Sequence, residues 1–335
     1  LVIEKRDHLG GNAYDFHNEH GILQHKYSPH IFHTNLPDVW NYLAQFTQWN
    51  GYVHRVLAHV DGMNLPIPIN LNTVNRLLKK YFTEQEVEEY FHSVRLSGKP
   101  IRNARDVVVS QVGELFYEKF FKNYTKKQWG VYPEELAAEV TQRIPVRFNS
   151  DDRYFSDTYQ GLPALGYSVL FDTMLSHLNI TVLLNTDYKT VINDLSFQRL
   201  VYTGPVDYFF DFKYGKLPYR SLRFEAETLD RDRYQEVAVI NYSNEHEFTR
   251  ITEFKHMTLQ QHLKTTIVRE YPQNDGDPYY PIPMPSTAEI YEKYRVDAEK
   301  LSNVHFMGRL AEYRYINMDQ AVKHALDMFH KIACI

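Results

Sequence analysis

Residues 1–12, LVIEKRDHLGGN, constrain the fold more than any other part of the chain. A short apolar run ends on the acid Glu4, and a polar turn then leads to the glycine pair Gly10 and Gly11. The second strand of a dinucleotide-binding fold ends in this way, because its terminal acid accepts hydrogen bonds from ribose hydroxyls and nearby glycines let the backbone approach a pyrophosphate. Any buried strand followed by a turn has a similar pattern, so this segment alone leaves both interpretations open.

The glycine fingerprint of such a fold, G-x-G-x-x-G, should precede the acid by roughly 20 residues. This chain begins on the strand that carries the acid. We therefore expect the natural protein to have a preceding strand, glycine-rich loop and helix of about 30 residues, the usual size of such a unit. That helix would offer its N-terminus to the pyrophosphate, so a chain without it should bind a dinucleotide poorly.

Length and composition exclude several classes of protein. The 335 residues predict two or three domains, and 43% hydrophobic with 24% charged residues is typical of a soluble globular protein. No apolar run approaches the roughly 20 residues of a membrane helix, so we expect no membrane partner. The net charge of -5 argues against nucleic acid as a partner. The single cysteine, Cys334, excludes internal disulfides and favours a cytoplasmic location.

One segment of a long helical region points to a ligand. In residues 107–124, Phe116, Phe120 and Tyr124 lie four apart on one stripe of a helix, and the polar end 125–130, TKKQWG, follows directly. Aromatic rings beside exposed polar groups can sandwich a flat base. A stripe that faces the core is the alternative, and for Phe116 we favour it.

Two arginines flank a proline in residues 143–147, RIPVR. Pro145 favours an extended backbone, which places Arg143 and Arg147 on the same side. Such residues more often form surface ion pairs, and they become a phosphate site only where other cations converge with them.

Further along the chain, strand-like runs with polar turns between them predict an antiparallel sheet. This sheet contains Asn241 and Arg250. The runs are residues 220–226, 237–242, 248–255 and 265–271.

His30 and His33 have the spacing of a pair of metal ligands on a helix. Pro29 disfavours a helix leading into them, and no third ligand lies close by in the sequence. We therefore predict no metal site.

The C-terminal region contains a candidate anion site. An apolar run ends on Gly308 and Arg309, and residues 317–319 open the final helix. The N-terminus of a helix has free N–H groups and the positive end of a dipole. Aimed at a flavin, it would stabilise negative charge on the reduced ring.

Ordered motifs along nearly the whole chain resemble the UDP-galactopyranose mutases of the bacterial type. They are EKRDHLGGNAYD, KYSPHIFHT, YTKKQWG, RIPVR, RYFSDTYQGLP, VYTGPVDYFFDF, YRSLRF, EYP, DPYYP and GRLAEYRYINMDQ. The resemblance implies an α/β fold in three parts, FAD as the cofactor and a homodimer. The parts are a discontinuous Rossmann-like FAD-binding domain (1–52, 155–204 and 286–335), an inserted helical domain (71–142) and an antiparallel β-sheet domain (53–70, 143–154 and 205–285).

The resemblance also implies the reaction. Such an isomerase interconverts UDP-galactopyranose and UDP-galactofuranose for the biosynthesis of cell-wall and other polysaccharides. N5 of the reduced flavin attacks the anomeric carbon and expels UDP, and the adduct opens to a flavin–sugar iminium. The sugar recloses as a furanose and UDP recaptures it, with no net redox change. The sequence fits this chemistry, since we find no convincing catalytic triad or metal cluster in it.

Matching the motifs residue by residue implies roles for individual side chains. Cofactor binding is implied for Glu4, Lys5, Gly11, Asn12, His30, Ile31, His33, Arg309, Ile316, Asn317, Met318 and Asp319. Substrate binding is implied for Phe120, Tyr124, Thr125, Trp129, Arg143, Tyr154, Asn241, Arg250, Tyr280 and Tyr315. Arg143 and Arg250 would clamp the diphosphate and His33 would tune the flavin, so these three come closest to catalytic residues.

Ser28 departs from the family pattern. It replaces the glycine that usually precedes the run PHIFHT. A serine at a position that needs a positive φ is strained, though tolerable.

Two other functions stay open at this point. A flavin-dependent oxidoreductase of the amine-oxidase-like group would share the cofactor fold, but it has no need for Arg143, Arg250 and a stacking Tyr124 together. A non-catalytic relic that binds UDP-sugars is suggested by the missing glycine-rich loop.

Overall fold

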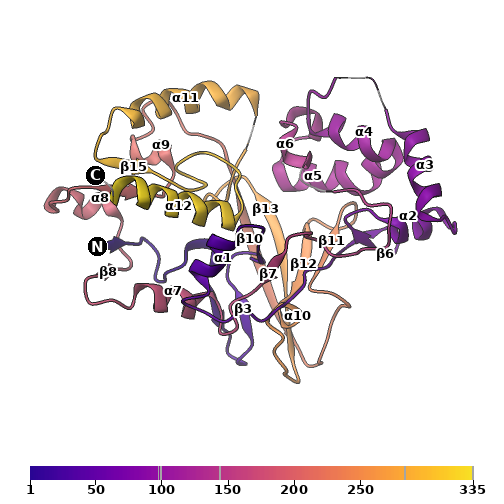
Figure 1. The fold of residues 1–335 in the computed structure, drawn as a ribbon, viewed down its shortest axis with the longest axis horizontal. Coiled ribbons are helices and arrows are strands. Elements are labelled where there is room, and N and C mark those ends of the chain that lie inside the picture. The colour runs from indigo at the N-terminus through magenta and orange to yellow at the C-terminus, as the bar shows by residue number, and fades with distance from the viewer. Residues whose placement is uncertain (97, 99, 143–144, 283, 334–335) are drawn as a thin grey trace.

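The computed structural model describes residues 1–333 apart from 97, 99, 143–144 and 283 (Figure 1). The helices of residues 71–142 form one end of the molecule, a large sheet crosses the middle, and both chain termini lie at the other end (Figure 1). Helices and sheets are thus combined in one molecule, and the predicted α/β class is confirmed.

A seven-stranded sheet forms the centre of the molecule. Its strands, in spatial order, are β14 (Tyr280–Pro281), β10 (Tyr219–Leu229), β13 (Thr265–Gln273), β12 (Arg250–Glu253), β11 (Val239–Tyr242), β5 (Val56–Val60) and β6 (Met63–Ile67). The four predicted runs correspond to β10 to β13 and pair antiparallel, as expected. However, β5 lies parallel to β11, so the sheet as a whole is mixed. Parallel neighbours need a long crossover, and here most of the chain's helices lie between the two strands.

Two pairs of parallel strands join segments that are far apart in the sequence. They are β1 (Val2–Ile3) with β8 (Val182–Leu183), and β9 (Leu200–Tyr202) with β15 (Val304–Phe306). Helices α7 (Tyr167–Leu175), α11 (Pro285–Glu299) and α12 (Met318–Ala333) lie around them (Figure 1). The strand predicted before Glu4 is therefore confirmed, and its parallel partner is reached through a crossover, as in Rossmann-like folds.

The helical region contains α2 (Leu71–Leu78), α3 (Glu84–Val94), α4 (Ala104–Phe116), α5 (Asn123–Trp129) and α6 (Glu139–Gln142). The single helix predicted over residues 107–124 is interrupted by a kink at Gly113, where φ is 78°, and by the π-helical turn Tyr117–Lys122. A Cβ atom at Gly113 would lie 2.8 Å from the carbonyl oxygen of Val94, so only glycine lets α3 approach α4 this closely.

One hydrophobic core joins the helical region to the sheet. Val56 and Val60 of β5 are buried in the same cluster as Val108 and Phe116 of α4. Phe116 is fully buried, which confirms its predicted place in the core. Close packing across this boundary fixes α4 and α5 relative to β11 and β12.

Short elements complete the fold. They are α1 (Pro37–Leu43), β2 (Asp15–His17), β3 (Leu23–His25), β4 (Phe32–Thr34), β7 (Tyr159–Gly161), α8 (Tyr188–Val191), α9 (Val206–Phe209) and α10 (Lys255–Thr258). The carboxylate of Asp15, which is 1% exposed, accepts hydrogen bonds from the backbone nitrogens of Tyr167 (2.6 Å) and Ser168 (2.8 Å). It thereby satisfies free N–H groups at the start of α7. None of the helices in the described ranges has both the length and the apolar character that crossing a bilayer requires.

Candidate functional site

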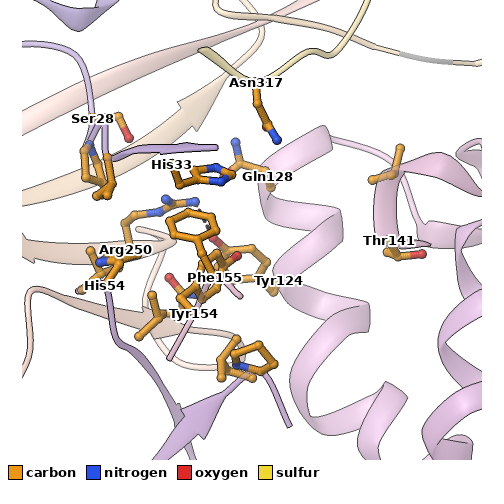
Figure 2. Close-up of a pocket in the computed structure, with 18 of the residues that line it drawn as sticks. Ser28, His33, His54, Tyr124, Gln128, Thr141, Tyr154, Phe155, Arg250 and Asn317 are labelled. Carbon is orange, nitrogen blue, oxygen red and sulfur yellow. Dashed lines mark hydrogen bonds between the residues drawn. The ribbon is translucent and has the colours of Figure 1, made fainter. Parts of the chain in front are cut away.

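A cavity of about 550 Å³ opens where the three parts of the molecule meet. Its walls come from residues 28–33, from α5, from β11 and β12, and from the start of α12. Figure 2 shows Arg250 and Phe155 near its centre, with Tyr124 on the helical side and Ser28 on the opposite side. Small-molecule sites typically have volumes in this range.

Aromatic rings line the cavity where α5 ends. The ring of Trp129 meets Tyr315 edge-on at 5.6 Å between centroids and lies 6.1 Å from the ring of Tyr280. The guanidinium of Arg309 lies over both tyrosine rings, 5.0 Å and 5.4 Å from their centroids. In the described part of the chain, the side-chain oxygen of the buried Gln128 has no hydrogen-bond partner. A flat base with an N–H group suits this wall, because the rings offer stacking surface and Gln128 offers an acceptor.

Arg250 brings a fixed positive charge into the cavity. Its Nη2 atom donates to the hydroxyl of Tyr124 at 2.6 Å, and its Nε lies 3.6 Å from Oε1 of Glu270, its neighbour across β12 and β13. Burial is the largest single influence and lowers the pKa of Arg250, but Glu270 and the nearby phenols of Tyr124, Tyr280 and Tyr154 together outweigh burial and raise the pKa above its ordinary value. Burial also raises the pKa of Tyr124 to about 12, so the phenol keeps its proton. A guanidinium beside a phenol donor is well suited to a phosphate.

Asn241 and Tyr154 complete this wall. Asn241 faces Arg250 across β11 and β12, and its side-chain oxygen is buried with no hydrogen-bond partner among the described residues. The backbone nitrogen of Tyr154 donates to the carbonyl of His54 at 2.8 Å, and the rings of Tyr154 and Phe155 meet edge-on. Unpartnered polar atoms beside a cavity indicate that a ligand takes up their hydrogen bonds.

Two histidines line the cavity, each held through its Nδ1 atom. Nδ1 of His30 lies 3.0 Å from the carbonyl oxygen of Ser28, and burial lowers the pKa of His30 to about 3, so the ring is neutral and donates through Nδ1. Nδ1 of His33 lies 2.9 Å from Oδ2 of Asp157. The His33 ring also stacks on Phe155 at 3.6 Å between centroids (Figure 2). The Asp157 carboxylate accepts a hydrogen bond from Nδ1 of His33, which leaves the Nε2 atom to face a ligand.

The residues at the start of α12 fit an anionic, flat cofactor such as FAD. Asn317, Met318 and Asp319 line the cavity at the N-terminus of this 16-residue helix. The dipole of the helix favours negative charge there, while side chains of the same segment accept from the backbone nitrogens of Asn317 and Gln320. Ile316 is buried and does not line the cavity, but its carbonyl accepts a hydrogen bond from Arg309 at 2.7 Å. The histidine segment, residues 30–33, lines the same cavity, so a flat cofactor with a negative charge would lie beside both the helix dipole and the histidine rings.

The four cofactor residues predicted near the N-terminus lie away from this cavity. The Glu4 carboxylate accepts from the backbone nitrogen of Arg6 at 2.8 Å, and the side-chain oxygen of Asn12 accepts from the Arg6 guanidinium at 2.9 Å. Lys5 forms an ion pair with Asp277 at 3.2 Å. The space around Gly11 is open, with no atom within 4 Å of a Cβ placed there. A role for these residues at the adenosine end of FAD stays a prediction.

Most of the other predicted site residues line the one cavity. They are His30, Ile31, His33, Phe120, Tyr124, Thr125, Trp129, Tyr154, Asn241, Arg250, Tyr280, Arg309, Tyr315, Asn317, Met318 and Asp319. Arg143 lies outside the described residues. The sequence analysis missed further lining residues: His54, Gln128, Phe155, Asp157 and Ser243. The run 154–157 beside the predicted Tyr154 contained a usable signal, since it carries an aromatic ring and a carboxylate together.

Comparisons with known proteins agree with this geometry. A family model described as UDP-galactopyranose mutase matches residues 119–315, and one described as an NAD(P)-binding Rossmann-like domain matches residues 1–46. The chain is 39% identical to a "Probable UDP-galactopyranose mutase" of Klebsiella pneumoniae, over 97% of this chain and 86% of that protein. It is 36% identical to a dTDP-fucopyranose mutase of Escherichia coli, over 97% and 90% of the two chains.

A solved structure shares the fold. The crystal structure of a reduced UDP-galactopyranose mutase matches with a TM-score of 0.80 at 16% identity, over 99% of this chain and 88% of that chain. The relatives in Klebsiella pneumoniae and Escherichia coli are named as mutases of two different sugar nucleotides.

Proposed function

The chain belongs to the UDP-galactopyranose mutase family, and we propose that it interconverts UDP-galactopyranose and UDP-galactofuranose. The observation that carries the proposal is the position of Arg250. This cation is held between Glu270 and Tyr124, and it shares a cavity with the aromatic wall around Trp129. A nucleoside diphosphate has the two parts that such a site recognises, a flat base and a charged diphosphate.

When bound, reduced FAD supplies the nucleophile of the reaction, its N5 atom, and the residues at the start of α12 and in the histidine segment would hold its ring. The side chains around Arg250 bind the diphosphate and stabilise its negative charge while the bond between sugar and UDP is broken. Tyr124 keeps its proton and can donate a hydrogen bond to the same oxygens. His33, oriented by Asp157 through Nδ1, presents its Nε2 atom to the cofactor side of the cavity. Arg143 is proposed as the second diphosphate clamp on the family resemblance alone.

The direct test is to load the purified protein with FAD, reduce it with dithionite, and follow UDP-galactofuranose formation by chromatography. Conversion that requires the reductant, but consumes none beyond the amount that reduces the flavin once, would support an isomerase. UDP binding without conversion would favour a non-catalytic relic, and oxygen consumption with an amine would favour an amine-oxidase-like enzyme.

A second candidate substrate, dTDP-fucopyranose, follows from the relative in Escherichia coli that is 36% identical. The two sugar nucleotides differ in the base methyl, the ribose 2′-hydroxyl and the sugar 6-hydroxyl. Both should be assayed side by side, and the larger kcat/KM identifies the substrate.

The family resemblance also supports a homodimer with the three domain limits given above, acting in the cytoplasm in the biosynthesis of cell-wall and other polysaccharides. Light scattering of the purified protein tests the dimer. Limited proteolysis tests the domain limits, since linkers between compact units are cleaved first.

A further inference from the structure

Ser28 has a backbone conformation that serine rarely adopts. Its φ is 72°, in the left-handed region, and the residue is only 5% exposed. Glycine would take this conformation without strain. Strained residues persist where the surrounding structure holds them, often at functional sites. We therefore expect the Ser28 side chain to make an interaction that offsets the backbone strain.

The Ser28 hydroxyl reaches a buried carboxylate. It donates a hydrogen bond to Oε2 of Glu270, which lies 242 residues away in the sequence and is 1% exposed. The other oxygen, Oε1, has no hydrogen-bond partner in the described part of the chain, and neither does the facing Nε of Arg250. The 3.6 Å between them is an ion pair but not a hydrogen bond. The bond from Ser28 therefore directs the Glu270 side chain.

Glu270 in turn sits behind Arg250. The two residues are directly opposed across β12 and β13, and the guanidinium is held by Glu270 on one side and by Tyr124 on the other. If the Glu270 carboxylate shifted, the guanidinium of Arg250 that it attracts would shift with it. Small displacements of a charged group in a buried site strongly change its hydrogen bonds to a ligand.

Ser28 also contacts the histidine segment through its backbone. Its carbonyl oxygen accepts the hydrogen bond from Nδ1 of His30, which lines the cavity. One residue thus joins the segment proposed to face the cofactor to the cation proposed to bind the diphosphate.

We propose that Ser28 is a positioning residue for the diphosphate site: its hydroxyl orients Glu270, and Glu270 orients Arg250. This inference rests on the proposed function, because it takes the diphosphate of a nucleotide as the ligand of Arg250. It adds a residue at which this chain departs from the family's usual glycine.

The experiment compares Ser28→Ala and Ser28→Gly in the FAD-loaded protein, with UDP and uridine as separate ligands in calorimetric titrations. Both variants lose the hydroxyl, but only glycine relieves the strained backbone. We expect both to bind UDP about five- to tenfold more weakly, somewhat less than the full loss of a hydrogen bond to a charged group, and to bind uridine as the parent does. Ser221→Ala, an equally buried serine outside the cavity lining, is the matched control and should change neither affinity.

A double-mutant cycle tests whether Ser28 affects UDP binding through Arg250. In an Arg250→Lys background, Ser28→Ala should weaken UDP binding by roughly twofold or less, because the group it orients is gone. Full additivity of the two substitutions would overturn the proposal. Unchanged UDP affinity in Ser28→Ala, or equal weakening of UDP and uridine binding, would overturn it as well. So would UDP affinities of Ser28→Ala and Ser28→Gly that differ in the same order as the melting temperatures of these variants. If the parent protein binds no UDP, the proposed function fails and this inference fails with it. If the parent binds UDP and Ser28→Ala binds it equally well, only this inference fails.

Discussion

Replacing Arg250 with lysine tests the proposed diphosphate site most directly. Lysine keeps the positive charge beside the buried Glu270, so the variant does not leave an unpaired carboxylate in the interior. However, arginine contacts Tyr124 at 2.6 Å and Glu270 at 3.6 Å while still offering further N–H groups. A single ammonium that stays with these two partners cannot also present a planar fork to a diphosphate.

The expected loss of UDP affinity follows from the hydrogen bond to the diphosphate that Arg250→Lys removes. One hydrogen bond to a charged phosphate contributes about 1.5–3 kcal/mol, which corresponds to roughly a 10- to 150-fold higher Kd for UDP. Uridine lacks the diphosphate, so its Kd should stay within about twofold of the parent value. Titration calorimetry of the FAD-loaded protein with each ligand measures both values.

Arg269→Lys is the matched control. Arg269 lies on β13 next to Glu270, but its guanidinium pairs with Glu227 at 2.8 Å and does not line the cavity. This variant should bind UDP and uridine as the parent does. Equal weakening of UDP and uridine by Arg250→Lys would show that Arg250 supports the architecture of the site and does not bind the diphosphate, and the reasoning would be refuted.

Three further predictions concern stability and the histidine segment. Asp15→Ala should lower the free energy of unfolding by about 3 kcal/mol, because it leaves two backbone N–H groups of α7 without an acceptor. Asp15→Asn should lower it less, and urea denaturation measures both values. Burial lowers the pKa of His25 to about 4, so stability is full above the ordinary pKa near 6.5 and falls by up to about 3 kcal/mol as pH drops from 6.5 to 4. His25→Asn should make the urea midpoint fall less over that range, although the buried His30 and His54, whose pKa values burial also lowers, still contribute, whereas the exposed His92→Asn should leave the fall unchanged. Asp157→Ala should lower kcat about tenfold with little change in UDP affinity, because His33 loses the acceptor that orients it; weaker UDP binding at unchanged kcat would contradict this role.

Much of the fold could be predicted because it is encoded locally. Alternating apolar residues with polar turns marked β10 to β13, and the antiparallel pairing of β11 with β12 and of β12 with β13 followed from their short connections. The interruption of the helix at residues 107–124 could not be predicted, because Gly113 is needed only where the backbone of Val94 approaches it. The parallel pairing of β5 with β11 depends on how distant segments dock, which local periodicity does not record.

The residues of the candidate site likewise include some that the sequence identified and some that it did not. Tyr124 was singled out by its place in an aromatic stripe beside a polar helix end, whereas the role of Arg250 was implied by the family resemblance. Asp157 was missed because a carboxylate gains its role only from the histidine it contacts, 124 residues away in the sequence.

The sequence by itself determined the class of fold, the family and most of the side chains that line the cavity, because periodicity and residue chemistry are carried by neighbouring positions. Only the tertiary structure decided how those side chains are held. The bond from Ser28 to Glu270 spans 242 residues, and such long-range contacts arise when packing brings separate segments together. Their geometry sets the orientation of Arg250, on which the proposed chemistry depends.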